Sequence, residues 1–147
     1  MTKDLLKAQY LRAKAVDYAW AWIGTPYVWG GDDFSGFDCS GLVIEILKGV
    51  GLLPHNYDTT ANGLYIRYAS KAVEKGSAGC LVFWFNSKMV AKHVEMMIDD
   101  LHTIGASGGG SSTKTIADAI AQNAFIKMRP FWYRGDIFKI VDPFKEL

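Results

Sequence analysis

The sequence predicts an α+β domain in which N-terminal helices pack on a central antiparallel β-sheet. Apolar residues with helical spacing fill much of the first half of the chain, and short β-prone segments separated by turns follow Gly76. Half of the 147 residues are hydrophobic and 14% are aromatic, which suits a folded globule with one core. No repeat or long linker interrupts residues 1–147, so we expect a single domain.

Residues 3–23 are expected to form the first helix. Apolar residues recur there every three or four positions, which predicts one buried face. These residues are Leu6, Tyr10, Ala13, Val16, Trp20 and Ile23. Gly24, shortly before Pro26, should end the helix.

The next segment, "GTPYVWGGDDFSGFD" at residues 24–38, is rich in Gly, Pro and Asp and predicts an irregular loop. Asp38 is a good N-cap for a second helix that begins at or beside Cys39 and stops at Gly51. The apolar residues expected on its buried face are Leu42, Val43, Ile46, Leu47 and Val50.

The rest of the chain predicts mostly strands, with a short helix before them and another among them. The helices are expected within residues 61–70 and 113–124. The strands are expected at 80–85, 93–99, 101–107, 125–133 and 136–142.

Charge and cysteine content exclude several classes of protein. The net charge is +1 and no cluster of Lys and Arg is present, so nucleic acid is not expected as a partner. No apolar run is long enough for a signal peptide or a membrane span, so delivery outside a cell would need another route. Cys39 and Cys80 are too few for a disulfide framework and lack the spacing of a zinc site.

Cys39 is a candidate nucleophile because it lies at a predicted helix start. The unpaired N–H groups and the helix dipole there favour thiolate over thiol, and the same N–H groups can hold an oxyanion. The alternative is that Cys39 packs as a small hydrophobic residue. Among the three histidines, His55 and His102 are expected in exposed turns, whereas His93 opens a strand and is the better candidate base. A strand histidine with a purely structural role is the alternative for His93.

The segments "GTPYVWGG", "FDCSGLV", "CLVFWF", "KHVEMMID" and "IGAS" together resemble the NlpC/P60 cysteine peptidase family, over about Ala19 to Ile104. The resemblance implies a papain-like domain that cleaves peptide or isopeptide bonds in bacterial cell-wall stem peptides, often after D-γ-glutamate. A compact catalytic domain without a signal peptide fits a phage-encoded lysis or tail-associated protein, or a cytoplasmic enzyme that recycles wall peptides. The implied partner is the wall peptide, the chain is expected to be a monomer, and neither a metal nor an organic cofactor is implied.

The resemblance also implies roles for individual residues. Cys39 would attack the scissile carbonyl, and His93 would accept the thiol proton and pass it to the leaving amine. Tyr27 would bind the oxyanion together with the Cys39 N–H, unless it is only a core aromatic residue. Asp38, Ser40 and Trp29 would contact the substrate, although helix capping alone would explain the first two.

One position departs from the family pattern. Gly105 stands where the family usually has a polar residue, most often histidine, that orients the catalytic histidine. Glu95 is our preferred substitute, because residues two apart project from the same strand face and a carboxylate can hold an imidazole. A solvent-facing role for Glu95, or orientation of His93 by a backbone carbonyl, water or His102, is the alternative.

Smaller departures concern Cys80 and the glycine-rich segment. Cys80 replaces an aspartate of the family and is expected to be structural and unpaired. The segment "GASGGGSSTK" lacks the lysine position of a phosphate-binding loop and is expected to form a loop at the cleft edge.

Two functions compete with hydrolysis. A silent wall-binding or phage-structural domain is the first, because Gly105 removes the usual third residue. Transfer of the acyl group to an amine is the second, since a thioester can react with acceptors other than water.

Overall fold

A computed structural model describes residues 2–33, 36–135 and 137–147. The α-helices are α1 (Lys3–Ala21), α2 (Cys39–Gly49), α3 (Ala61–Tyr68) and α4 (Ile116–Gln122), and the 3-10 helices are η1 (Ala69–Lys71) and η2 (Phe131–Arg134). The strands are β1 (Asp32–Asp33), β2 (Gly36–Phe37), β3 (Ala72–Val73), β4 (Leu81–Phe85), β5 (Ala91–Met97), β6 (His102–Ser107), β7 (Phe125–Pro130) and β8 (Phe138–Val141).

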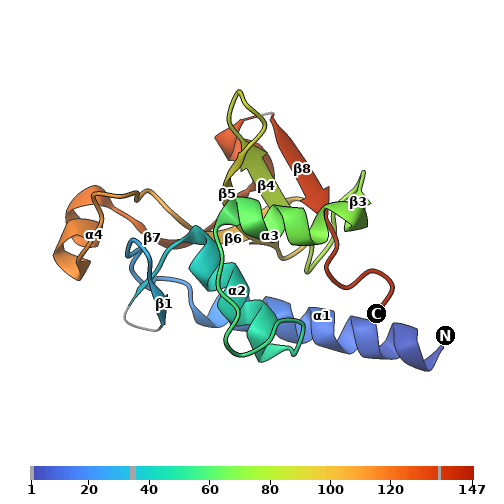
Figure 1. Ribbon diagram of the computed structural model, residues 1–147. Coiled ribbons are helices and arrows are strands. Elements are labelled where there is room, and N and C mark those ends of the chain that lie inside the picture. Colours follow the sequence, from blue (N-terminus) through green and yellow to red (C-terminus); the bar gives the residue numbers. More distant parts are fainter. Residues whose placement is uncertain (1, 34–35, 136) are drawn as a thin grey trace.

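The main sheet has six strands in the order β3-β8-β4-β5-β6-β7, and all neighbours are antiparallel. Figure 1 shows α2 between this sheet and α1, with α4 set to one side of the sheet. The predicted α+β class, with N-terminal helices on an antiparallel sheet, is therefore confirmed.

Helix α1 buries a different face from the one predicted. Its buried residues are Ala8, Ala15 and Ala19, with Leu11 and Trp22 packed against the core beside them. Leu6, Tyr10 and Trp20 are exposed. The prediction was wrong because it gave weight to large apolar residues, whereas a row of alanines lets α1 approach its neighbours closely.

Helix α2 begins and packs as predicted. Asp38 is its N-cap, and its carboxylate accepts a hydrogen bond of 2.7 Å from the N–H of Gly41. The buried face includes Leu42, Val43 and Leu47 and lies in the main core. The start of this helix is therefore fixed in place by packing and capping together.

The sheet has apolar residues on both faces. Alternate residues such as Phe83, Val94 and Met96 face the helices and join the main core. Val82, Trp84, Met97 and Ile140 belong to a second cluster, against which Phe131 and Phe138 pack. His93 and Glu95 alternate with Val94 and Met96 and so share a strand face with Met97, as predicted.

One predicted strand is too long, and the two-residue strands β1, β2 and β3 were not predicted. The strand predicted for residues 125–133 ends at Pro130, and η2 follows it. Proline has no backbone N–H, so it cannot continue the ladder as a donor. The two-residue strand β3, which pairs with β8, was not predicted because so short a segment has no detectable period.

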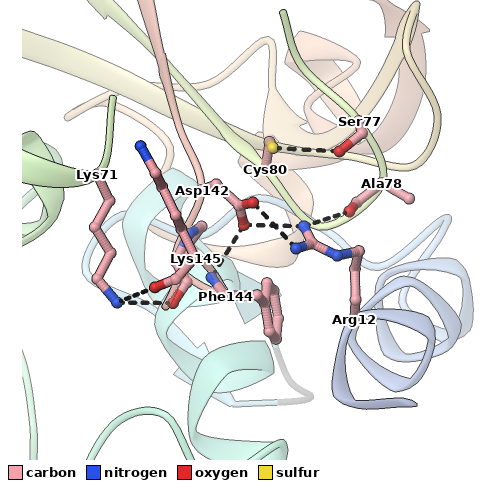
Figure 2. A network of polar contacts seen from close by, with 9 residues as sticks. Arg12, Lys71, Ser77, Ala78, Cys80, Asp142, Phe144 and Lys145 are labelled. Atoms are coloured by element: carbon pink, nitrogen blue, oxygen red, sulfur yellow. Dashed lines mark hydrogen bonds and ion pairs between the residues drawn. The ribbon is translucent and has the colours of Figure 1, made fainter. Parts of the chain in front are cut away.

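The end of the chain is attached to α1 and η1 by polar contacts (Figure 2). The Arg12 guanidinium donates to both carboxylate oxygens of Asp142 at 2.9 and 3.0 Å and to the Ala78 carbonyl at 3.1 Å. Lys71 Nζ donates to the Lys145 carbonyl at 2.8 Å.

None of the helices in the described part of the chain combines the length and apolar character that a bilayer crossing requires.

Candidate active site

A cleft of about 610 Å³ opens where the start of α2 meets the start of β5 and the end of β6. Six of the residues singled out in the sequence line it. They are Tyr27, Trp29, Asp38, Cys39, Ser40 and His93. Segments far apart in the chain therefore contribute the candidate side chains to one site.

Cys39 is the first residue of α2 and is half-buried at the cleft. Its position is fixed by the preceding residue, because Asp38 accepts hydrogen bonds from Gly41 N at 2.7 Å and from Gly30 N at 3.1 Å. Asp38 thus joins the start of α2 to the loop that carries Tyr27. Asp38 acts as a helix cap while it also lines the cleft.

His93 lines the cleft together with Cys39 and contacts Glu95. Its side chain is almost fully buried, and its Nε2 is 2.7 Å from Glu95 Oε2. Burial by itself would lower the pKa of His93, but the nearby Cys39 side chain and the hydrogen bond and charge of Glu95 raise that pKa above its usual value. Because Nε2 is bound to Glu95, Nδ1 is the ring nitrogen that remains for another partner.

Glu95 is a buried, fully bonded carboxylate, only 1% exposed. Its Oε1 accepts from Thr103 Oγ1 at 2.7 Å, and its Oε2 accepts from Tyr133 Oη at 2.6 Å as well as contacting His93. Burial alone would raise the pKa of Glu95. His93, Thr103 and Tyr133 together outweigh this effect, so the pKa of Glu95 is lowered from its usual value. The alternative of a solvent-facing glutamate is wrong.

Gly105 leaves the space that the Glu95 side chain fills. A Cβ atom at position 105 would lie 2.2 Å from Glu95 Cγ and 2.8 Å from Oε2, which is too close to be tolerated without movement. The carboxylate on β5 therefore occupies the room into which a side chain on β6 would project.

Tyr27 is buried with 5% exposure and lies beneath the glycine-rich loop. A Cβ atom on Gly109 would lie 2.3 Å from Tyr27 Cδ1, so the loop backbone packs directly on the ring. Burial raises the pKa of Tyr27, and the nearby charges of Cys39 and Asp38 raise it further. Its hydroxyl group therefore stays protonated and remains a donor at ordinary pH.

The other histidines and the second cysteine lie away from the cleft. His55 is exposed, and His102 Nδ1 contacts Asp99 Oδ2 at 3.0 Å. Neither lines the cleft, and Glu95 rather than His102 contacts His93. Cys80 is buried and free, as predicted, with its sulfur 3.7 Å from Ser77 Oγ.

Sequence reasoning missed several residues of the site. Asp58, Lys92 and Arg134 line the cleft, and Thr103 and Tyr133 bond to Glu95. The strand period would place Thr103 and Gly105 on one face of β6, but only the pairing of β6 with β5 brings that face to Glu95.

Comparison with known proteins gives the family. The model of the NlpC/P60 family matches residues 24–130. The probable peptidoglycan endopeptidase LytE of Bacillus subtilis is 28% identical over 119 residues, which are 81% of this chain and 34% of LytE. Protein P54 of Enterococcus faecium is 34% identical over 105 residues, which are 69% of this chain and 19% of P54. The chain thus spans about a third or less of the length of these curated relatives.

Solved structures share the fold. The NlpC/P60 domain of the peptidoglycan hydrolase SagA is 27% identical with a TM-score of 0.64, and the match covers 89% of this chain and 97% of that one. The peptidoglycan hydrolase RipB of Mycobacterium tuberculosis has a TM-score of 0.69 at 22% identity, with 97% and 68% covered. The family match over most of the chain, together with this likeness of fold, leads to one conclusion: the chain belongs to the NlpC/P60 family.

Proposed function

We propose that this chain is a cysteine peptidase that hydrolyses peptide or isopeptide bonds in bacterial cell-wall stem peptides, with D-γ-glutamyl bonds as the preferred target. The observation that carries the proposal is the buried His93 ring, which is hydrogen-bonded to Glu95 and lines the same cleft as Cys39 at the start of α2. Relatives named as peptidoglycan endopeptidases support the substrate class.

In the first step the Cys39 sulfur attacks the scissile carbonyl carbon after its proton has moved to His93. The carbonyl oxygen becomes an oxyanion, and the Tyr27 hydroxyl and the Cys39 N–H donate hydrogen bonds to it. The C–N bond then breaks, the imidazolium gives its proton to the leaving amine, and a thioester remains on Cys39.

In the second step water replaces the amine. His93, neutral again, takes a proton from water while the water oxygen attacks the thioester carbon. The C–S bond breaks, the peptide acid leaves, and Cys39 and His93 return to their starting state. Glu95 holds the ring and stabilises the imidazolium in both steps.

The cleft contains the cationic Lys92 and Arg134 as well as two carboxylates, and it is the carboxylates that suit a peptide with a free amino end. Asp38 and Asp58 both line it, and the Asp58 charge contributes to the raised pKa of Asp38, whose largest cause is burial. Two carboxylates attract an ammonium group, and Ser40 adds a hydroxyl group beside them. Trp29 is 55% exposed at the same cleft and offers a ring surface for the substrate.

The first test replaces the nucleophile. Cys39→Ala should abolish cleavage of defined muropeptides, because no other group in the cleft can form the thioester. Cys80→Ala is the matched control, since Cys80 is the other free cysteine and lies outside the cleft. Mass spectrometry of the products measures both the loss and the bond that is cut.

Cleavage that persists in folded Cys39→Ala protein would contradict the assignment. The same products distinguish hydrolysis from acyl transfer. In the presence of an added amine, a hydrolase yields the free acid, whereas a transferase yields the amide.

A further inference from the structure

We propose that Thr103 and Tyr133 are positioning residues that hold the Glu95 carboxylate against His93, in the space that Gly105 leaves. The inference rests on the proposed function, because it explains how the proposed base is oriented in a chain without a side chain at position 105. It adds two residues, one from β6 and one from η2, that act on the Glu95 carboxylate and do not line the cleft.

The hydrogen-bond geometry supports the assignment. Thr103 Oγ1 donates to Oε1 at 2.7 Å and Tyr133 Oη donates to Oε2 at 2.6 Å, while Oε2 lies 2.7 Å from His93 Nε2. Both carboxylate oxygens are thus bonded, and a buried carboxylate bonded in this way is held in one orientation.

Burial makes these donors necessary. Glu95 is 1% exposed, so water cannot replace a lost donor, and a buried carboxylate without donors is costly to ionise. Thr103 is fully buried, and Tyr133 packs its ring against Trp84, with centroids 6.1 Å apart. The two hydroxyl groups therefore keep Glu95 charged as well as placed.

Gly105 is the steric part of the arrangement. Any larger residue there would push its Cβ into Glu95 Cγ. The Glu95 side chain on β5 can occupy its position only because residue 105 on β6 has no side chain. In the sequence, Gly105 was an argument for a catalytically silent domain. In the structure, the Glu95 carboxylate requires a glycine at this position.

The charged and titratable groups around Glu95 come from several elements. His93 on β5 and Tyr133 on η2 contact it directly. Arg129 on β7 stacks over the Tyr133 ring at 4.9 Å, and Arg134 on η2 lies close enough to influence Tyr133.

The first experiment follows the Glu95 carboxylate by carbon-13 NMR in Cys39→Ala protein, so no substrate is needed. The Glu95 signal is identified by its loss in Cys39→Ala/Glu95→Gln protein. Thr103→Val and Tyr133→Phe should each move the titration midpoint of Glu95 upward by about one pH unit, because each removes a donor to the ionised form. Tyr10→Phe, at an exposed tyrosine on α1, should leave the midpoint unchanged.

The second experiment is a double-mutant cycle on peptide cleavage. Gly105→Ala should lower kcat about tenfold or more with a smaller change in KM, because the added methyl group displaces Glu95. In a Glu95→Ala background the same change should cost nothing further, since the atoms it meets are gone.

The outcomes separate the two proposals. Midpoints that stay in place in both Thr103→Val and Tyr133→Phe overturn the positioning roles of these two residues. An equal cost of Gly105→Ala with and without Glu95 overturns the steric role of Gly105. If Cys39→Ala still cleaves peptides, the proposed function fails, whereas the substrate-free titration still decides the roles of Thr103 and Tyr133.

Discussion

The buried carboxylate of Glu95 and the buried ring of His93 shift each other's pKa in opposite directions. The pKa of Glu95 is lowered and that of His93 is raised, in each case against the effect of burial. The pair therefore favours a carboxylate beside an imidazolium. On the proposed function this is the state that faces the Cys39 thiolate before attack.

Glu95→Gln tests this coupling through the pH dependence of catalysis. The amide lacks the charge that raises the pKa of His93, so that pKa should fall and the imidazolium should lose its proton at lower pH. The alkaline limb of kcat/KM should therefore move to lower pH, and kcat should drop by at least about tenfold. Rates measured on a stem peptide between neutral and alkaline pH provide the check.

An alkaline limb that coincides with that of the unmodified protein would mean that Glu95 does not act on His93 during catalysis. Glu45→Gln is the matched control, because Glu45 lies on the same helix as Cys39 but outside the cleft. This variant should leave the alkaline limb of kcat/KM in place.

At the scale of elements, strong local signals were enough for α2 and for β5. An N-cap followed by a helical apolar pattern located Cys39 at a helix start, and strand alternation put His93 and Glu95 on one face. Both were predicted from a few neighbouring residues. The family resemblance then predicted that Cys39 on the helix and His93 on the strand act together at one site.

The remaining features depend on contacts between distant segments. The buried face of α1 is a row of alanines whose burial is set by the neighbours of the helix, not by its own period. Tyr133 reaches Glu95 only because β7 ends at Pro130 and η2 turns the chain over the second face of the sheet. Pro130 marks the end of β7 in the sequence, but the contact of Tyr133 with Glu95 and the choice of buried face on α1 have no local signal.

The glycine-rich loop after β6 offers a test at this scale. Gly109→Ala should lower kcat about 10- to 100-fold, because the new methyl group would meet the Tyr27 ring at 2.3 Å and displace the proposed oxyanion donor. Gly110→Ala is the neighbouring control, since a Cβ atom there meets nothing within 4 Å. Steady-state kinetics of the two variants compares them directly.

Equal activity of the two alanine variants would show that the Tyr27 ring is not held by this loop. A loss of stability without a change in kcat would assign Gly109 to packing alone.

The whole molecule is joined end to end by the contacts of Arg12. The guanidinium links α1 to Asp142 after β8 and to the Ala78 carbonyl, and it stacks over Phe144 at 5.1 Å. Arg12 and Asp142 are both largely shielded from water, with 22% and 14% of their side chains exposed, so this pair is less screened than a surface pair. Asp142 and Phe144, which follow β8, thereby link the sheet to α1.

Arg12→Ala should lower the free energy of unfolding by about 1–3 kcal/mol, because it leaves Asp142 without its charged partner. Peptidase activity at low temperature should be unchanged, since none of these residues lines the cleft. Urea unfolding measures the first effect. Lys14→Ala, at an exposed position on the same helix, is the control and should change stability by less than about 0.5 kcal/mol.

If the midpoint and slope of the urea transition are unchanged in Arg12→Ala, the contacts of Arg12 with Asp142, Ala78 and Phe144 do not contribute to the free energy of unfolding.

The location of the cleft between α2 and β5 has a consequence for when the protein can act. The proposed nucleophile and base belong to halves of the chain that meet only after the helical layer has docked on the sheet. A nascent or partly denatured molecule carries an isolated thiol and an isolated imidazole, neither of which can cut a peptide bond. On the proposed function, activity would therefore begin only once the chain has folded.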